Sequence, residues 1–169
     1  MSNSQIKKAQ SVGSALLAAR AQAMQRGEHN MELVAEKEGA VWINNSMATT
    51  VDLTWEALRD VNGPVLLIIG GIDRNNDYGK LKQLVAEKVK AVIFLGGQRE
   101  KYMRIFQPIT NGLIVDASTL HEAVEFANAY AWPGDTVLFS PSCPSYHAFD
   151  NYKNRGNDFK ISVRRVLGE

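Results

Sequence analysis

Three polar loops carry the residue types that could do chemistry. Residues 70–78 (GGIDRNNDY) contain two glycines, which allow close backbone approach. They also contain Arg74, which could bind an anion. Residues 140–152 (SPSCPSYHAFDNY) place serine hydroxyls between aromatic side chains, a composition typical of a small-molecule pocket. Residues 43–50 (INNSMATT) end in hydroxyls that can hold an anion together with the N–H groups of a following helix. The chemistry indicated is the binding of a small anion.

Each loop also has a purely structural interpretation. Asn76 and Asp77, next to glycines, are typical of a turn that caps the following helix, and Thr49 and Thr50 are equally typical of a helix start. A turn with a cap does not account for Arg74, so both interpretations stay open.

Common catalytic motifs are absent from the sequence. It contains no G-x-G-x-x-G, no G-x-x-x-x-G-K-[ST] and no G-x-S-x-G pattern. His147 lies close to Ser145, but without such a pattern a hydrolase triad is disfavoured. Cys143 has no evident partner that would stabilise a thiolate, which predicts a buried structural thiol. His29 and His121 are too scattered to indicate a metal site.

Composition excludes several classes of protein. The chain of 169 residues suits one α/β core, and Lys+Arg of 19 against Asp+Glu of 18 leaves a formal net charge of +1. That balance predicts no nucleic-acid partner. No apolar run approaches the roughly 20 residues that span a bilayer, so we expect no membrane partner. The single cysteine suits a reducing compartment and predicts a cytoplasmic protein.

Alternating strands and helices must position these loops. The apolar runs PVLLIIGG, KAVIFLGG, LIVDAS and DTVLFS lack polar alternation, which indicates strands buried on both faces. Helices are predicted between them at residues 78–88, 99–106 and 120–130. The alternation predicts a Rossmann-like α/β fold of three layers with a mostly parallel sheet. Ligands of such sheets bind beyond the carboxyl ends of the strands, where the polar loops lie.

Further elements flank this pattern. Residues 1–27 are rich in alanine and place apolar residues at spacings of three and four, which predicts one extra N-terminal helix. Residues 31–35 and 40–44 predict a β-hairpin. Residues 155–157 (RGN) predict a tight turn into a terminal helix.

Together, the three motifs resemble the C-terminal domain of the Mur ligases, most of all the type that adds D-glutamate. That family typically reads INDSKATN, GG-x-DKGNDY and PGD-x-VLLSPACAS-x-D-x-F-x-N-[FY]-x-x-RG-x-x-F, and residues 28–166 follow this order and spacing. The resemblance implies the domain that delivers the incoming amino acid in ATP-dependent peptide-bond formation during peptidoglycan synthesis. It divides the chain into an N-terminal helix at residues 1–27 and a Mur-ligase-like domain at residues 28–169.

The resemblance also assigns roles to residues. Thr49, Ser145 and Tyr152 match positions that cradle D-glutamate, and Arg74 takes the place of a lysine that pairs with its carboxylate. Tyr146 joins this set as part of the aromatic pocket wall. We therefore expect these residues to bind a small amino acid or carboxylate.

Positions that face the nucleotide depart from the family pattern. Asn30 replaces an arginine that reaches the ATP phosphates, Asn45 replaces an aspartate that contacts the nucleotide, and Met47 replaces a catalytic lysine. In the serine loop, His147 stands where the family has an aspartate. A thioether cannot stabilise developing negative charge as a lysine does. We predict that the chain alone has no cofactor and no catalytic residue, with ATP and Mg²⁺ involved only if an ATPase domain completes it.

Three functions follow as hypotheses. The leading one is a stand-alone, diverged copy of the family domain that binds a D-glutamate-like ligand and is not catalytic alone. One alternative is the C-terminal part of an active D-glutamate ligase, completed by its ATPase domain. The other is a non-catalytic scaffold or interaction protein. In each case the N-terminal helix could pair with a second copy or with a ligase partner.

Overall fold

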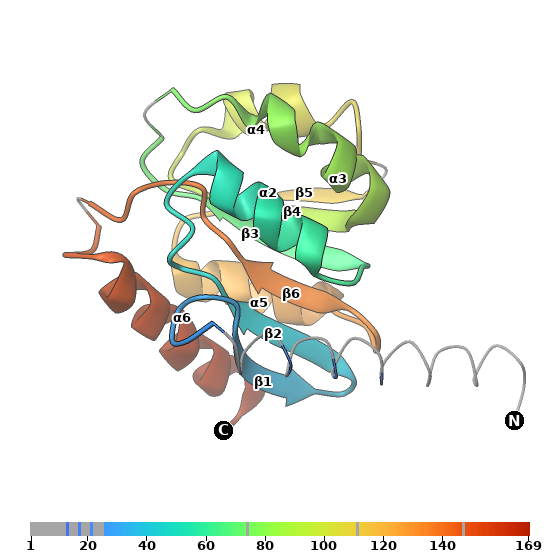
Figure 1. The fold of residues 1–169 in the computed structure, drawn as a ribbon, viewed down its shortest axis with the longest axis vertical. Helices are drawn as coiled ribbons and strands as arrows, with labels where there is room; N and C mark the ends of the chain where they lie inside the picture. The colour runs from blue at the N-terminus through green and yellow to red at the C-terminus, as the bar shows by residue number, and fades with distance from the viewer. Residues whose placement is uncertain are drawn as a thin grey trace, which may run out of the picture.

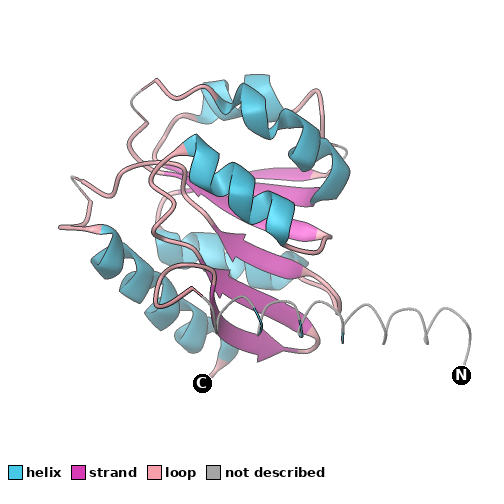
Figure 2. Ribbon diagram, in the orientation of Figure 1, coloured by secondary structure: helices cyan, strands magenta, loops and turns pink. Residues whose placement is uncertain are grey.

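A mixed sheet between two helical layers forms the core of the molecule (Figure 1). The computed structural model describes residues 26–73, 75–110, 112–146 and 148–169, together with Gly13, Leu17 and Ala21. Within them six strands follow the order β1-β2-β6-β3-β4-β5. Only the β1–β2 pair is antiparallel, and helices cover both faces of the sheet (Figure 2). The predicted α/β, Rossmann-like class is confirmed.

The elements lie close to their predicted places. The strands are β1 (Glu32–Lys37), β2 (Ala40–Asn44), β3 (Val65–Gly70), β4 (Val89–Leu95), β5 (Leu113–Ala117) and β6 (Thr136–Phe139). The helices are α2 (Val51–Asp60), the 3-10 turn η1 (Tyr78–Leu81), α3 (Lys82–Lys88), α4 (Arg99–Phe106), α5 (Leu120–Tyr130) and α6 (Tyr152–Leu167). The helix predicted at residues 78–88 therefore begins with a 3-10 turn, and the predicted hairpin is formed by β1 and β2.

The last strand in the sequence lies in the middle of the sheet. Phe139, which ends β6, pairs in register with Asn44 at the end of β2 and with Ile68 near the end of β3. Parallel strands end at the same edge of a sheet. This order therefore brings together the loops that follow β2, β3 and β6, although they are far apart in the sequence.

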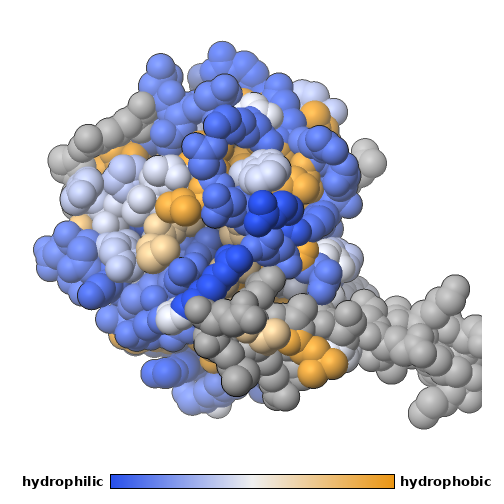
Figure 3. Space-filling view, viewed as in Figure 1, coloured by the Kyte–Doolittle hydropathy of each residue, from blue (hydrophilic) through white to orange (hydrophobic). Residues whose placement is uncertain are grey.

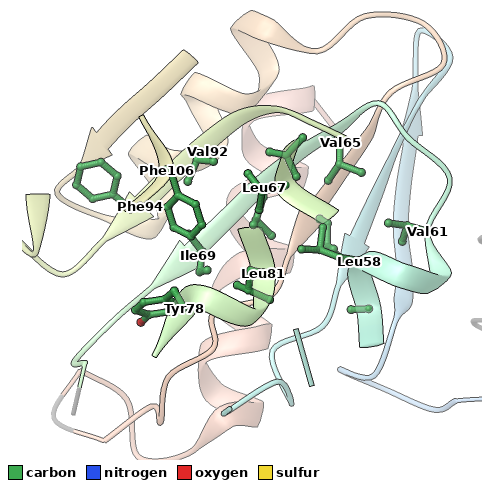
Figure 4. Close-up of a cluster of buried hydrophobic side chains, with 14 of the residues drawn as sticks. Leu58, Val61, Val65, Leu67, Ile69, Tyr78, Leu81, Val92, Phe94 and Phe106 are labelled. Carbon is green, nitrogen blue, oxygen red and sulfur yellow. The ribbon is translucent and has the colours of Figure 1, made fainter. Parts of the chain in front are cut away.

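Two hydrophobic cores lie on opposite faces of β3. Alternate residues of this strand (Val65, Leu67 and Ile69) pack with side chains of α2, η1, α3 and α4, as Figure 4 shows. Leu66 and Ile68 pack against α5 and α6 on the other face. Every residue of β3 is buried, as predicted for a strand covered on both faces. By contrast β5, at the edge of the sheet, is only partly buried.

Helix α6 corrects the prediction of a tight turn at residues 155–157. The helix already begins at Tyr152, where the side chain of Asn151 accepts two backbone N–H groups of the first turn. Gly156 lies inside the helix, and a Cβ there would be 2.2 Å from Nδ1 of His29. The prediction is wrong because this glycine provides room for a neighbouring side chain and does not break the helix.

The extra helix predicted at residues 1–27 falls almost entirely outside the described residues. Near its end, the Arg26 guanidinium forms an ion pair of 2.5 Å with the Asp60 carboxylate. This contact attaches the segment before β1 to the end of α2. Among the described helices, none combines the length and the apolar character needed to cross a bilayer.

Candidate functional site

The polar loops meet where the parallel strands end. The backbone N–H of Asn45 donates to the carbonyl oxygen of Phe139 at 2.8 Å, and that of Gly70 donates to the carbonyl oxygen of Pro141 at 2.9 Å. These bonds attach the loops after β2 and β3 to the loop after β6. Much of the surface on the face drawn in Figure 3 is hydrophilic, with hydrophobic residues in scattered patches.

Arg155 of α6 joins two of these loops by hydrogen bonds. Its Nε donates to the Ser46 hydroxyl at 3.1 Å, and one Nη donates to the Ser46 carbonyl oxygen at 2.7 Å. The other Nη donates to the carbonyl oxygen of Cys143 at 2.8 Å. In turn, the Ser46 hydroxyl donates to the carbonyl oxygen of Tyr152 at 2.7 Å. We call these four residues the Arg155 network.

Burial sets the electrostatics of Arg155. The residue is 4% exposed, and desolvation lowers the pKa of its guanidinium to about 10. It therefore stays charged at neutral pH. Among the described residues no carboxylate forms an ion pair with it. A buried cation held only by neutral oxygens keeps most of its attraction for an anion.

The residues predicted to bind the amino acid lie in different parts of this region. Ser145 is buried and Tyr146 is 57% exposed, and both line one cavity. Thr49 is half-buried before α2, and Tyr152 is half-buried as the first residue of α6. Neither of them is among the cavity's lining residues. Arg74 lies outside the described residues.

A cavity of about 290 Å³ opens at the carboxyl ends of the parallel strands. Its walls are mostly apolar and come from the loops after β3, β4, β5 and β6 and from α6. They include Ile72, Leu95, Thr119, Phe139, Phe149 and Arg155. The sequence predicted a ligand site at this edge of the sheet, and these loops do enclose a cavity there.

The positions that the resemblance predicts to face the nucleotide form part of the protein's own packing. Asn45 is 4% exposed, its Oδ1 accepts from the backbone N–H of Met31 at 3.2 Å, and its Nδ2 donates to the Ser140 hydroxyl at 3.2 Å. Met47 and Asn30 are half-buried and uncharged. ATP phosphates with Mg²⁺ need cationic donors and carboxylate ligands. The residues at these three positions do not fit that group.

His29 belongs to a charged cluster beside these positions. Its Nδ1 lies 3.0 Å from Nδ2 of Asn44, which donates to it, and burial lowers the pKa of His29, so the ring is neutral. Ligand atoms of Glu28, His29 and Glu32 lie within 4.8 Å of one another, a spacing that could hold a metal ion. The Lys160 ammonium lies 2.5 Å from the Glu28 carboxylate and 3.2 Å from that of Glu32. This ammonium supplies the cluster's positive charge.

Cys143 is a buried thiol, as predicted. Its Sγ lies 3.3 Å from the Tyr78 hydroxyl and 3.6 Å from Nδ2 of Asn76. Burial raises the pKa of the Cys143 thiol above its ordinary value. A protonated and enclosed thiol is a poor nucleophile. His147, its neighbour in the same loop, lies outside the described residues.

Arg155 belongs to this site although no sequence motif indicated it. The adjacent glycine led to the prediction of a turn, and the spacing of Arg155, Phe159 and Val163 was the available signal against it. These residues recur every four positions and are all buried in α6. That period is typical of the buried face of a helix.

Comparisons with known proteins agree with this architecture. Residues 29–143 match the family model described as Mur ligase, glutamate ligase domain. The UDP-N-acetylmuramoylalanine--D-glutamate ligase of Porphyromonas gingivalis is 44% identical over 135 residues, which cover 80% of this chain and 30% of that protein. The enzyme of the same name from Chlorobaculum parvum is 42% identical over 139 residues, or 82% and 29% of the two chains.

Solved structures show the same fold. The MurF ligase from Thermotoga maritima, solved in complex with ADP, superposes with a TM-score of 0.54 at 13% sequence identity. The match covers 84% of this chain and 32% of that one. The chain thus spans about 30% of the length of the curated relatives that it matches.

Proposed function

This chain belongs to the Mur ligase family through its glutamate ligase domain, and we propose that it binds a small amino acid or carboxylate of the D-glutamate type. In this proposal it acts in peptidoglycan metabolism as a binding module that forms no peptide bond by itself. The relatives reported above are D-glutamate ligases by name, and this chain corresponds to about 30% of their length.

The Arg155 network is the observation that carries the binding proposal. It fixes the loop that bears Thr49, the loop that bears Ser145 and the start of α6 at Tyr152. Hydroxyls held in place before a ligand arrives lose little entropy on binding it. The first turn of α6 adds the positive end of a helix dipole, which favours a carboxylate.

The nucleotide-facing positions support the absence of catalysis by the chain alone. The Asn45 side chain forms hydrogen bonds with Met31 and Ser140, and Met47 has a thioether where the family has a lysine. A positive charge at such a position is worth several kcal/mol to a developing negative charge, and a thioether supplies none of it. We propose that this half of the family site has become structural.

Titration of the full chain with D-glutamate, L-glutamate and ADP, followed by calorimetry and NMR, tests the proposal. We expect D-glutamate to shift the backbone amides of Thr49, Ser145 and Tyr152. Ser145→Ala and Thr49→Val should each weaken binding about tenfold, because each removes a hydrogen bond to a charged group. Thr110→Val, in the loop between α4 and β5, is the matched control. Absence of binding by both D-glutamate and L-glutamate would overturn the proposal.

A second candidate function is favoured by the 44% identity to a D-glutamate ligase. The chain would then be the C-terminal part of an active ligase, completed by a central ATPase domain. Mixing it with such a domain, ATP and the nucleotide precursor would release phosphate in this case. The leading proposal expects no release. If Ser145→Ala and Thr49→Val affect no binding at all, the scaffold hypothesis is favoured instead.

A further inference from the structure

The cavity of about 290 Å³ carries two opposite charges along one side of α6. Arg155 and Asp158 both line it and are three residues apart, so they lie on the same face of the helix. Arg155 is buried and Asp158 is half-buried. Within the part of the chain that the structure describes, neither side chain forms an ion pair.

Arg155 has hydrogen-bonding capacity left after its contacts with the protein. Three of its N–H groups donate to oxygens of Ser46 and Cys143. A guanidinium has about five N–H donors, so further donors remain for a ligand. A carboxylate that reached the cavity end of the side chain could therefore be bound without breaking the Arg155 network. Its negative charge would compensate the buried cation.

Helix α5 also begins at this cavity, but its own side chains already cap its amino end. The Thr119 hydroxyl accepts from the backbone N–H of Glu122 at 3.1 Å, and the Glu122 carboxylate accepts from that of Ser118 at 2.7 Å. The Glu122 carboxylate places a negative charge at the start of α5. An anion in the cavity is therefore directed to Arg155 and away from this helix.

Most of the remaining cavity wall is apolar. Leu120, Phe139 and Phe149 contribute hydrocarbon surface, and Ile72 and Tyr146 flank it with exposed fractions of 44% and 57%. The volume lies near the lower end of the range of about 300–1,000 Å³ for small-molecule sites. The cavity therefore suits a compact ligand with an apolar body.

We propose that this cavity is a second binding site, for an α-amino acid with an aromatic or branched aliphatic side chain. The carboxylate pairs with Arg155, the ammonium pairs with Asp158, and the side chain packs against Phe149 and Leu120. A dicarboxylate such as glutamate is excluded, because its second charge would lie unpaired against apolar walls. The cavity adjoins the proposed D-glutamate site, with which it shares Ser145 and Tyr146, and its ligand differs in chemistry.

NMR titration of the ¹⁵N-labelled full chain tests the ligand class. L- and D-phenylalanine and L-leucine are compared with 3-phenylpropionate, which lacks the ammonium, and with phenylalaninamide, which lacks the carboxylate. We expect at least one amino acid to shift the amides of Gly71, Ser118 and Thr119 and to bind about tenfold more tightly than either analogue. D-Glutamate should leave the amide signals of Ser118 and Thr119 unshifted, which distinguishes this cavity from the proposed D-glutamate site.

Two variants test the pairing with Asp158 and the position of the ligand in the cavity, and both keep Arg155. Asp158→Asn should weaken phenylalanine binding about tenfold and leave 3-phenylpropionate unchanged, whereas Asp150→Asn, in the loop before α6, should change neither. Ala148→Trp should fill the mouth of the cavity and abolish binding. Equal affinity for phenylalanine and 3-phenylpropionate, an unaffected Asp158→Asn variant, or no shifts at the cavity residues would each overturn the proposal.

Discussion

The Arg155 guanidinium donates two hydrogen bonds to Ser46, one to its hydroxyl at 3.1 Å and one to its carbonyl oxygen at 2.7 Å. The two residues are separated by 109 positions in the sequence. Because the Ser46 hydroxyl also donates to the carbonyl oxygen of Tyr152, the loop after β2 is fixed to the first turn of α6. This relationship holds the candidate site together, and it can be tested directly.

Arg155→Met should destabilise the protein strongly. The substitution removes three hydrogen bonds and leaves the buried carbonyl oxygens of Ser46 and Cys143 without these donors. We expect the free energy of unfolding in urea to fall by about 3–5 kcal/mol. Arg164→Met, on the exposed side of the same helix, should change it by no more than about 0.5 kcal/mol. Similar small effects of both substitutions would contradict the role of the network.

Gly156→Ala should destabilise the protein although alanine favours helices. Propensity alone predicts a gain of about 1 kcal/mol in a helix interior. The new Cβ, however, would lie 2.2 Å from Nδ1 of His29, so we expect a net loss of about 1–3 kcal/mol in urea unfolding. The double variant His29→Ala/Gly156→Ala should recover part of the propensity gain. If Gly156→Ala alone is stabilising, the packing against His29 is not close.

Protonation of His29 should lower stability on mild acidification. Burial first, and the Lys160 ammonium second, lower its pKa below the ordinary value of 6.5, and Lys153 acts in the same direction against the opposing effects of Glu28 and Glu32. The unfolded chain therefore binds a proton at a higher pH than the folded chain. The contribution is complete above about pH 6.5 and is lost as the pH falls below it.

Unfolding free energies measured between about pH 7.5 and pH 5.5 check this expectation. His29→Asn should give a flatter profile than the parent chain over this interval. Parallel profiles for the two proteins would show that another group titrates there.

Cys143 should resist alkylation in the folded protein. The thiol is buried and its pKa is raised, so little thiolate is available to a reagent. Mass spectrometry after treatment with iodoacetamide should show negligible labelling in native buffer and full labelling in concentrated urea. Rapid labelling under native conditions would mean that the loop after β6 opens readily.

The order and type of the elements could be predicted from the sequence. Continuous apolar runs of strand length between amphipathic segments specify buried parallel strands and crossover helices, because only this arrangement covers both faces of each strand. The predicted helices at residues 99–106 and 120–130 match α4 and α5. The three polar loops were likewise found at strand ends, where hydroxyls, glycines and Arg74 had indicated a binding region.

Only the tertiary structure decided which of these residues act together. The place of β6 between β2 and β3 brings Ser46 and Cys143 within reach of Arg155, and no local pattern encodes that order. A glycine favours a turn when only its neighbours in the sequence are considered. In the fold, Gly156 is the residue that lets α6 pack against His29. The propensity for a helix or a turn depends on a few residues that are neighbours in the sequence. Burial and charge pairing depend on side chains that only the folded chain brings together.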